Sequence, residues 1–193
     1  MNAKQLGRDV SSLSVLLLLL TQFPLSGQDK AGVWTFDVKF ENPKTTKVTI
    51  PGRGERTVWY LEYEVTNNTK EPHSFIPVVQ LVTDKGNKEL PDEILPAVQD
   101  KLRVGVKNSV TASTTAIPAG GKIQAVAIWD DIDSTSTRFT VYLRGLSNGT
   151  DVQNKTTKYK TLQVKFQRDG KAQGIRQSGA QEWIYRERTI EKQ

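Results

Sequence analysis

Residues 57–67 read Thr57-Val58-Trp59-Tyr60-Leu61-Glu62-Tyr63-Glu64-Val65-Thr66-Asn67, and this stretch decides the fold. Trp59, Leu61, Tyr63 and Val65 share one parity, and they alternate with Tyr60, Glu62, Glu64 and Thr66. Successive side chains of a β-strand point to opposite faces of a sheet, so the alternation predicts a half-buried strand with an apolar inner face. Most of its residues are β-branched or aromatic, which suits a pleated and partly buried surface.

A second apolar run, residues 75–82, follows the polar turn 67–72 and predicts a hairpin or a pair of strands that crosses a sandwich. Similar alternation predicts further strands at 34–41, 47–50, 122–129, 139–144, 161–166 and 182–186. Residues 92–103 have a weak helical spacing, with Pro96 suited to a first turn. About seven to nine short strands predict an all-β fold, an antiparallel immunoglobulin-like β-sandwich, with a barrel as the alternative. The expected core residues are Trp59, Leu61, Val65, Val79 and Leu143.

The chain has 193 residues, of which 36% are hydrophobic and 25% charged, and these values suit one domain with a modest core. We expect residues 28–154 to form the β-sandwich core. Residues 155–193 should add one or two strands to the same domain. Cysteine is absent, which removes disulfides and all thiol chemistry.

Residues 1–27 have the pattern of a secretory signal peptide. Lys4 and Arg8 precede the apolar run 13–20, and the segment ends at small residues near Gly27. The apolar run is shorter than the roughly 20 residues that a spanning helix needs, although an uncleaved anchor is the alternative. The pattern predicts an extracytoplasmic protein, periplasmic or secreted, with no stable transmembrane span after processing.

Several motifs resemble those of exported bacterial proteins with an immunoglobulin-like domain. The Asn-polar turn at 67–69, the Asp-x-Gly turn at 84–86 and the turn Ile117-Pro118-Ala119-Gly120-Gly121 follow that pattern. Residues 127–130, 142–149, 160–162 and 182–185 are similar to a group of such proteins that is uncharacterised. The resemblance covers most of residues 57–185 and implies an exported immunoglobulin-like module without an assigned chemistry.

Catalytic and metal-binding patterns are weak. His73 is the only histidine, and with no cysteine a His/Cys metal cluster is excluded. Asp130, Asp131 and Asp133 crowd one loop and leave calcium binding open, although a central Gly and a closing Glu are missing. Glu62 and Glu64 share one face, as a pair of glycosidase acids would. The aromatic residues considered for sugar binding are Tyr60, Trp129 and Tyr142.

These patterns predict no catalytic residue, no cofactor and no metal. We therefore expect a non-catalytic exported module with a binding or structural role in the cell envelope. The alternative is a polysaccharide-acting enzyme or a carbohydrate-binding domain.

The positive charge of the mature chain lies at its C-terminal end. Residues 155–193 hold ten basic and four acidic residues, a net charge of +6. We expect a basic patch around one end of an edge strand, formed by Lys155, Lys158, Lys160, Lys165, Arg168 and Lys171. Its partner would be an anionic envelope polymer or another envelope protein, and not nucleic acid, which is rare outside the cell. The alternative is that these lysines protect an edge strand from aggregation.

Overall fold

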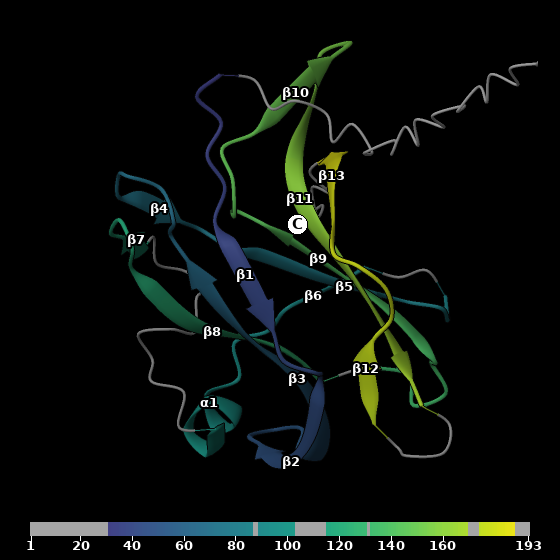
Figure 1. Cartoon of the computed structure of the whole chain (residues 1–193). Helices are drawn as coiled ribbons and strands as arrows, with labels where there is room; N and C mark the ends of the chain where they lie inside the picture. The colour runs from purple at the N-terminus through teal and green to yellow at the C-terminus, as the bar shows by residue number, and fades with distance from the viewer. Residues whose placement is uncertain (1–30, 87–88, 103–114, 131, 170–173, 188–193) are drawn as a thin grey trace, which may run out of the picture.

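The computed structural model describes residues 31–86, 89–102, 115–130, 132–169 and 174–187. They form an all-β protein with antiparallel sheets and one short helix, and not a barrel (Figure 1). The elements are β1 (Asp37–Phe40), β2 (Lys44–Ile50), β3 (Gly54–Thr66), β4 (His73–Phe75), β5 (Val78–Thr83), β6 (Glu89–Pro91), α1 (Pro96–Leu102), β7 (Thr115–Ile117), β8 (Lys122–Trp129), β9 (Arg138–Arg144), β10 (Thr150–Gln153), β11 (Thr156–Arg168), β12 (Ile175–Gln177) and β13 (Glu182–Glu187). The predicted signal segment, residues 1–27, lies outside the described residues.

The predicted central strand is β3, and it organises the first sheet. One edge of β3 pairs with β2 and then with β1, and the other edge pairs with β8. Trp59, Leu61, Tyr63 and Val65 are buried, which confirms the predicted parity. The strand ends at Thr66, and the side chain of the next residue, Asn67, donates to the carbonyl oxygens of Glu71 and Ile117, each at 2.8 Å. Asn67 thus ties the predicted polar turn to β7.

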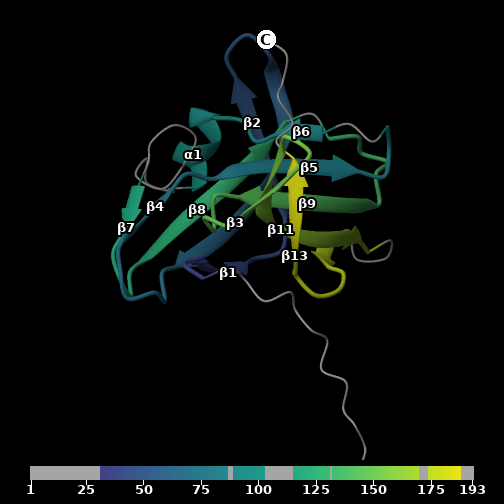
Figure 2. The ribbon, with the colours of Figure 1, turned by 90° about the horizontal axis from the view of Figure 1, so that it is seen from above.

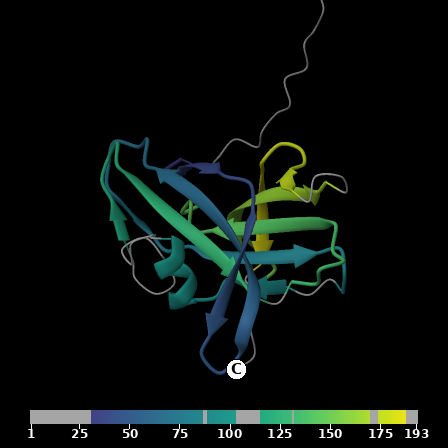
Figure 3. The ribbon, with the colours of Figure 1, turned by 90° about the horizontal axis from the view of Figure 1, so that it is seen from below.

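The second sheet is built around β5, β9 and β11. Its strand order is β6–β5–β9–β11, with β10 continuing the β9 edge of β11 and with β12 and β13 on the opposite edge. Strands β3 and β5 therefore belong to different sheets, as a sandwich-crossing pair requires. Figures 2 and 3 show β5 and β9 running obliquely to β3 and β8.

The main core lies between the two sheets. All five residues expected there (Trp59, Leu61, Val65, Val79 and Leu143) are buried in it. Residues 34–36 also join the sheets, because the Phe36 amide donates to the Leu146 carbonyl at 2.7 Å just before β1 begins. Residues 34–36 thus contact the second sheet, and β1, which follows them, joins the first sheet.

A second apolar cluster covers part of the outer face of β3 and β8, where the alternation predicted a solvated surface. Val58, Val126 and Ile128 are buried there beneath α1, and Tyr60 packs against them. The interpretation of this face as an ordinary solvated sheet surface was wrong for this half of the sheet. Helix α1 lies within the predicted helical range 92–103, and its Val98 points into the cluster.

The C-terminal section adds more strands than expected, and β11 is not an edge strand. Residues 156–167 pair with β10 and β9 along one edge, while residues 158–168 pair with β13 and β12 along the other. The edge-strand expectation for this section was therefore wrong. Within the described ranges, no helix is both long enough and apolar enough to cross a membrane.

Candidate functional site

A groove of about 660 Å³ opens where the two sheets meet at one end of the molecule. One wall comes from Lys44, Thr45, Thr57 and Trp59 of β2 and β3, and another from residues 168–169 and 174–175 around β11 and β12. These segments lie side by side in Figure 1, and the Gln177 amide donates to Asn42 Oδ1 at 3.3 Å. Ile132 and Ser134, from the loop between β8 and β9, complete the lining.

Arg168, at the end of β11, lines this groove and is held against two aromatic rings. Its guanidinium carbon lies 5.1 Å from the centre of the Trp59 ring and 5.8 Å from that of Phe139. The two rings are themselves 5.0 Å apart. Cation–π contact of this kind is strongest where water is excluded, so the two rings stabilise the position of the guanidinium.

The guanidinium has buried donors that no protein acceptor satisfies. Nε and Nη2 of Arg168 are buried without a hydrogen-bond partner, and so is Oγ of Ser136. Ser136 adjoins Thr137, whose carbonyl accepts from the Arg168 amide at 2.8 Å. In the part of the chain that the structure describes, the unpartnered buried side-chain atoms thus gather at this one corner. Buried polar groups normally have partners in the protein or in ordered water, so this cluster marks the corner as a candidate site.

Other charges beside the groove are paired. Lys44 Nζ lies 2.6 Å from Glu41 Oε2 and 2.9 Å from Glu62 Oε2. Hydrogen bonds to Glu41 and then Glu62 raise the pKa of Lys44, which keeps it protonated. Asp169 pairs with Arg176. The groove is therefore lined by Arg168, by the paired charges of Lys44 and Asp169, and by the apolar side chains of Trp59, Ile132 and Ile175.

The predicted basic patch is not gathered at one place. Lys155 lies in the turn between β10 and β11, and Arg168 lies at the far end of a strand of 13 residues. Lys160 is buried, with Nζ 5.2 Å from the centre of the Trp183 ring. Lys165 lies on the opposite face and pairs with Glu182 at 3.4 Å.

Lys158, also in the predicted patch, has acidic cross-strand neighbours on both sides. It is opposite Asp151 of β10 and Glu187 of β13. Lys171 lies outside the described residues. The described members of the patch are thus spread over both faces and the length of β11, and acids lie beside several of them.

The acidic loop after β8 pairs with protein groups. Asp130 Oδ2 lies 2.6 Å from Arg53 Nη1, which also lies 3.3 Å from Glu93 Oε2. Asp133 Oδ1 accepts from the amide and hydroxyl of Thr135, and these bonds lower the pKa of Asp133. Asp131 lies outside the described residues. The described ranges contain no group of three or more His, Cys, Asp or Glu side chains that could hold a metal ion.

The two carboxylates considered for glycoside hydrolysis each have a lysine partner. Glu62 pairs with Lys44 at 2.9 Å, and Glu64 pairs with Lys122 at 2.9 Å. Lys122 also lowers the pKa of Glu64, whereas a general acid needs a raised pKa. His73 stacks on the ring of Trp34, with the ring centres 4.3 Å apart.

The aromatic residues considered for sugar binding do not form an open platform. Trp129 is buried and donates from Nε1 to the Leu90 carbonyl at 3.2 Å. Tyr60 packs against the second apolar cluster. Tyr142 lies beneath Arg186, whose guanidinium carbon is 3.8 Å from its ring centre.

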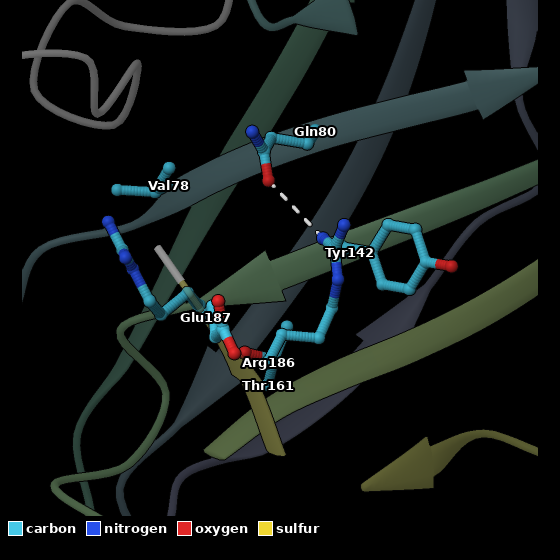
Figure 4. Close-up of a pocket in the computed structure, with 7 residues that line it drawn as sticks. Val78, Gln80, Tyr142, Thr161, Arg186 and Glu187 are labelled. Carbon is cyan, nitrogen blue, oxygen red and sulfur yellow. Dashed lines mark hydrogen bonds between the residues drawn. The ribbon is translucent and has the colours of Figure 1, made fainter. Parts of the chain in front are cut away.

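Arg186 closes a small hollow on the outer face of the second sheet (Figure 4). It donates to Gln80 Oε1 at 3.3 Å and to Glu89 Oε1 at 2.7 Å, so it ties β13 to β5 and β6. The hollow measures about 20 Å³, which is room for about one water molecule. The contacts of Arg186 across this hollow thus hold β13 against β5 and β6.

The sequence identified Arg168 but did not predict the groove that Arg168 lines. Arg168 was named as a basic residue that flanks a strand, but its burial against Trp59 depends on contacts between residues more than a hundred positions apart. The one local signal was a charged residue two positions after Phe166, where the alternating run 162–166 ends. Comparison of the chain with protein-family models, curated proteins and solved structures found no match.

Proposed function

We propose that this chain is a non-catalytic binding module with an immunoglobulin-like sandwich, and that it binds its ligand in the groove between Trp59 and Arg168. The observation that carries the proposal is a groove of about 660 Å³ where the two sheets meet, lined by Trp59, Ile175 and Arg168. Ligand pockets are commonly of about 300–1,000 Å³, with mostly apolar walls and a few placed polar groups.

The strand order supports the immunoglobulin-like assignment. In that fold the strands A, B and E share one sheet, and C, F and G share the other. Here β1, β3 and β8 would correspond to A, B and E, and β5, β9 and β11 to C, F and G, with β6 beside C. The differences include the strands β10, β12 and β13 along β11, where the immunoglobulin-like sheet would end, together with β2 along β3 and the separate pair β4–β7.

Export to the cell envelope is part of the same proposal. Its support is the basic and then apolar pattern of residues 1–27, together with a fold that uses no cysteine. N-terminal sequencing of the protein recovered from the envelope or the medium tests it. We expect a new N-terminus near Gly27, and an intact Met1 on membrane-associated protein would favour the anchor.

Amide chemical-shift mapping with a panel of ligand classes tests the binding role. The panel contains neutral oligosaccharides, an anionic polysaccharide, small aliphatic and aromatic carboxylates, and their neutral amides. We expect at least one class to give saturable shifts at Thr45, Thr57 and Ile175, which line the groove. Shifts confined to other surfaces, or none from any class, would overturn the proposal.

The enzymatic alternative has its own measurement. Release of reducing ends from the same polysaccharides should not exceed that of buffer. Release that disappears with Glu62→Gln would instead favour an enzyme.

A further inference from the structure

On one side the second sheet ends at β12 and β13, and β13 is the longer of the two (Figure 1). Within the described ranges β13 pairs with β11 alone, so half of its backbone N–H and C=O groups point away from β11 to an unpaired edge. Edge strands are often protected by lysine, by proline or by a very short length. β13 has six residues and neither lysine nor proline, and its apolar residues are Trp183, Ile184 and Tyr185. Its edge is therefore open to another strand.

The inner face of β13 carries two exposed aromatic rings. Trp183 lies opposite Leu162 of β11, so it continues the face that forms the main core. Tyr185 lies opposite Lys160 on the same face. The two aromatic residues are 39% and 42% exposed, although Lys160 contacts the Trp183 ring. Large apolar side chains that stay exposed side by side indicate a surface that a partner covers.

The outer face of β13 carries one charge of each sign, with Ile184 midway between them. Glu182 and Arg186 lie on this face, two positions before and two positions after Ile184. Hydrogen bonds to Gln80 and Glu89 hold Arg186 in place there. An antiparallel copy of the strand centred on Ile184 would therefore bring each Glu182 opposite the Arg186 of the other copy.

This register gives complementary cross-strand pairs at every position. Two identical strands pair symmetrically, and the faces of their sheets match only when residues of the same parity lie opposite each other. With Ile184 opposite itself, Glu182 faces Arg186 on the outer face. Trp183 then faces Tyr185 on the inner face, so opposite charges and aromatic rings each meet twice. A centre at Trp183 or Tyr185 would instead place Ile184 opposite a charged residue.

We propose that two copies of this chain pair through β13, antiparallel and with Ile184 on the twofold axis, so that their second sheets become one continuous sheet. The proposal goes beyond ligand binding in the groove near Trp59, because the described residues that line that groove include none of β13. The two proposals therefore stand or fall separately. An interface made by one pair of strands is small, so the dimer should dissociate on dilution.

Sedimentation equilibrium over a series of protein concentrations measures the dimer. We expect the mass of the wild-type protein to rise from that of one chain to that of two. Glu182→Arg would place an arginine opposite Arg186 in both halves of the interface, so the dissociation constant should rise at least about tenfold. Glu55→Arg is the matched control, because Glu55 and Glu182 are both exposed glutamates with a lysine Nζ at 3.4 Å. It should leave the dissociation constant unchanged.

A thiol cross-link tests the register without changing a charge. The chain has no cysteine, so Ile184→Cys introduces a single thiol, which the proposed axis places opposite its own copy. We expect a short bifunctional thiol reagent to link this variant into dimers. Val152→Cys is the control, because Val152 is 64% exposed on β10, along the other edge of β11, and it should be linked far more slowly.

Three results would each overturn the proposal. The first is a single-chain mass at every concentration. The second is a dimer that Glu182→Arg weakens no more than Glu55→Arg does. The third is cross-linking at Val152→Cys as fast as at Ile184→Cys, which does not depend on how well Glu182→Arg folds.

Discussion

Asp92 is a carboxylate placed where the chain crosses from one sheet to the other. Its amide donates to the Val79 carbonyl at 3.1 Å, and the next amide, of Glu93, donates to Ile128 of the other sheet at 2.8 Å. Burial raises the pKa of Asp92 from 3.8 to about 7. The charge of Asp92 also adds to the effect of burial in raising the pKa of Tyr63, in the main core. The folded protein therefore binds the Asp92 proton more tightly than the unfolded chain does.

This shift predicts a stability that falls with rising pH. The contribution of protonated Asp92 is fully present below about pH 4 and is lost as the pH rises through about 7. Asp92→Asn cannot ionise, so it should be more stable than wild type at pH 8 by up to roughly 3 to 4 kcal/mol, and the difference should shrink toward pH 4. Urea unfolding across this pH range measures it. Asp100→Asn, on the exposed side of α1, is the control, and an equal effect there would contradict the prediction.

At the scale of elements, α1 acts as a cover for the outer face of β3 and β8. Val98 is buried in the second apolar cluster, whereas Ile94, just before the helix, is 52% exposed. Val98→Ala should lower the free energy of unfolding by about 1–3 kcal/mol because it removes buried methyl groups. Ile94→Ala, the control, should change it by less than about 0.5 kcal/mol. Similar losses at both positions in urea titrations would show that α1 does not protect this face.

The elements also show what alternation can and cannot predict. Strands with three or more alternating pairs, such as β3 and β9, were predicted with their correct inner faces. Strands β4, β6, β7 and β12 have three residues each, too few for a period of two to be visible. The second cluster was missed because Val58, Val126 and Ile128 share the parity of charged neighbours, and only the position of α1 makes their face apolar.

At the scale of the whole molecule, the basic residues of the C-terminal section that the structure describes are dispersed. Binding to an anionic envelope polymer stays a prediction. Because the lysines are spread apart, we expect this binding to depend on the net charge of the protein and not on one local site. The variant Lys158/Lys160/Lys165→Gln should elute from an anionic column at nearly the same salt concentration as the control Lys39/Lys47/Lys122→Gln. Both variants lower the net charge by the same amount, and dispersed charges contribute to retention mainly through the net charge. A much earlier elution of the first variant alone would show a local polymer site on β11.

The candidate groove belongs to this scale too, which explains why the sequence could name Arg168 but not its role. Its walls come from four separate segments of the chain, and the pairing of β11 on both edges brings them together. No local pattern around Arg168 specifies that Trp59 lies against its guanidinium. The groove depends on how distant segments pair and pack, whereas the inward and outward faces of each strand follow from its local sequence.

The distant pairing of the chain ends sets an order of events during synthesis. The Trp34 amide bonds to Asn148, 114 positions later, and Gln177 bonds to Asn42 across 135 positions. The earliest strands therefore wait for partners that leave the ribosome last, and folding through such distant contacts is slow. A newly made chain would stay open long enough for a chaperone to hold it. Shortening the chain before β12 would remove Gln177 and leave one edge of β11 unpaired, and we expect the product to aggregate rather than fold.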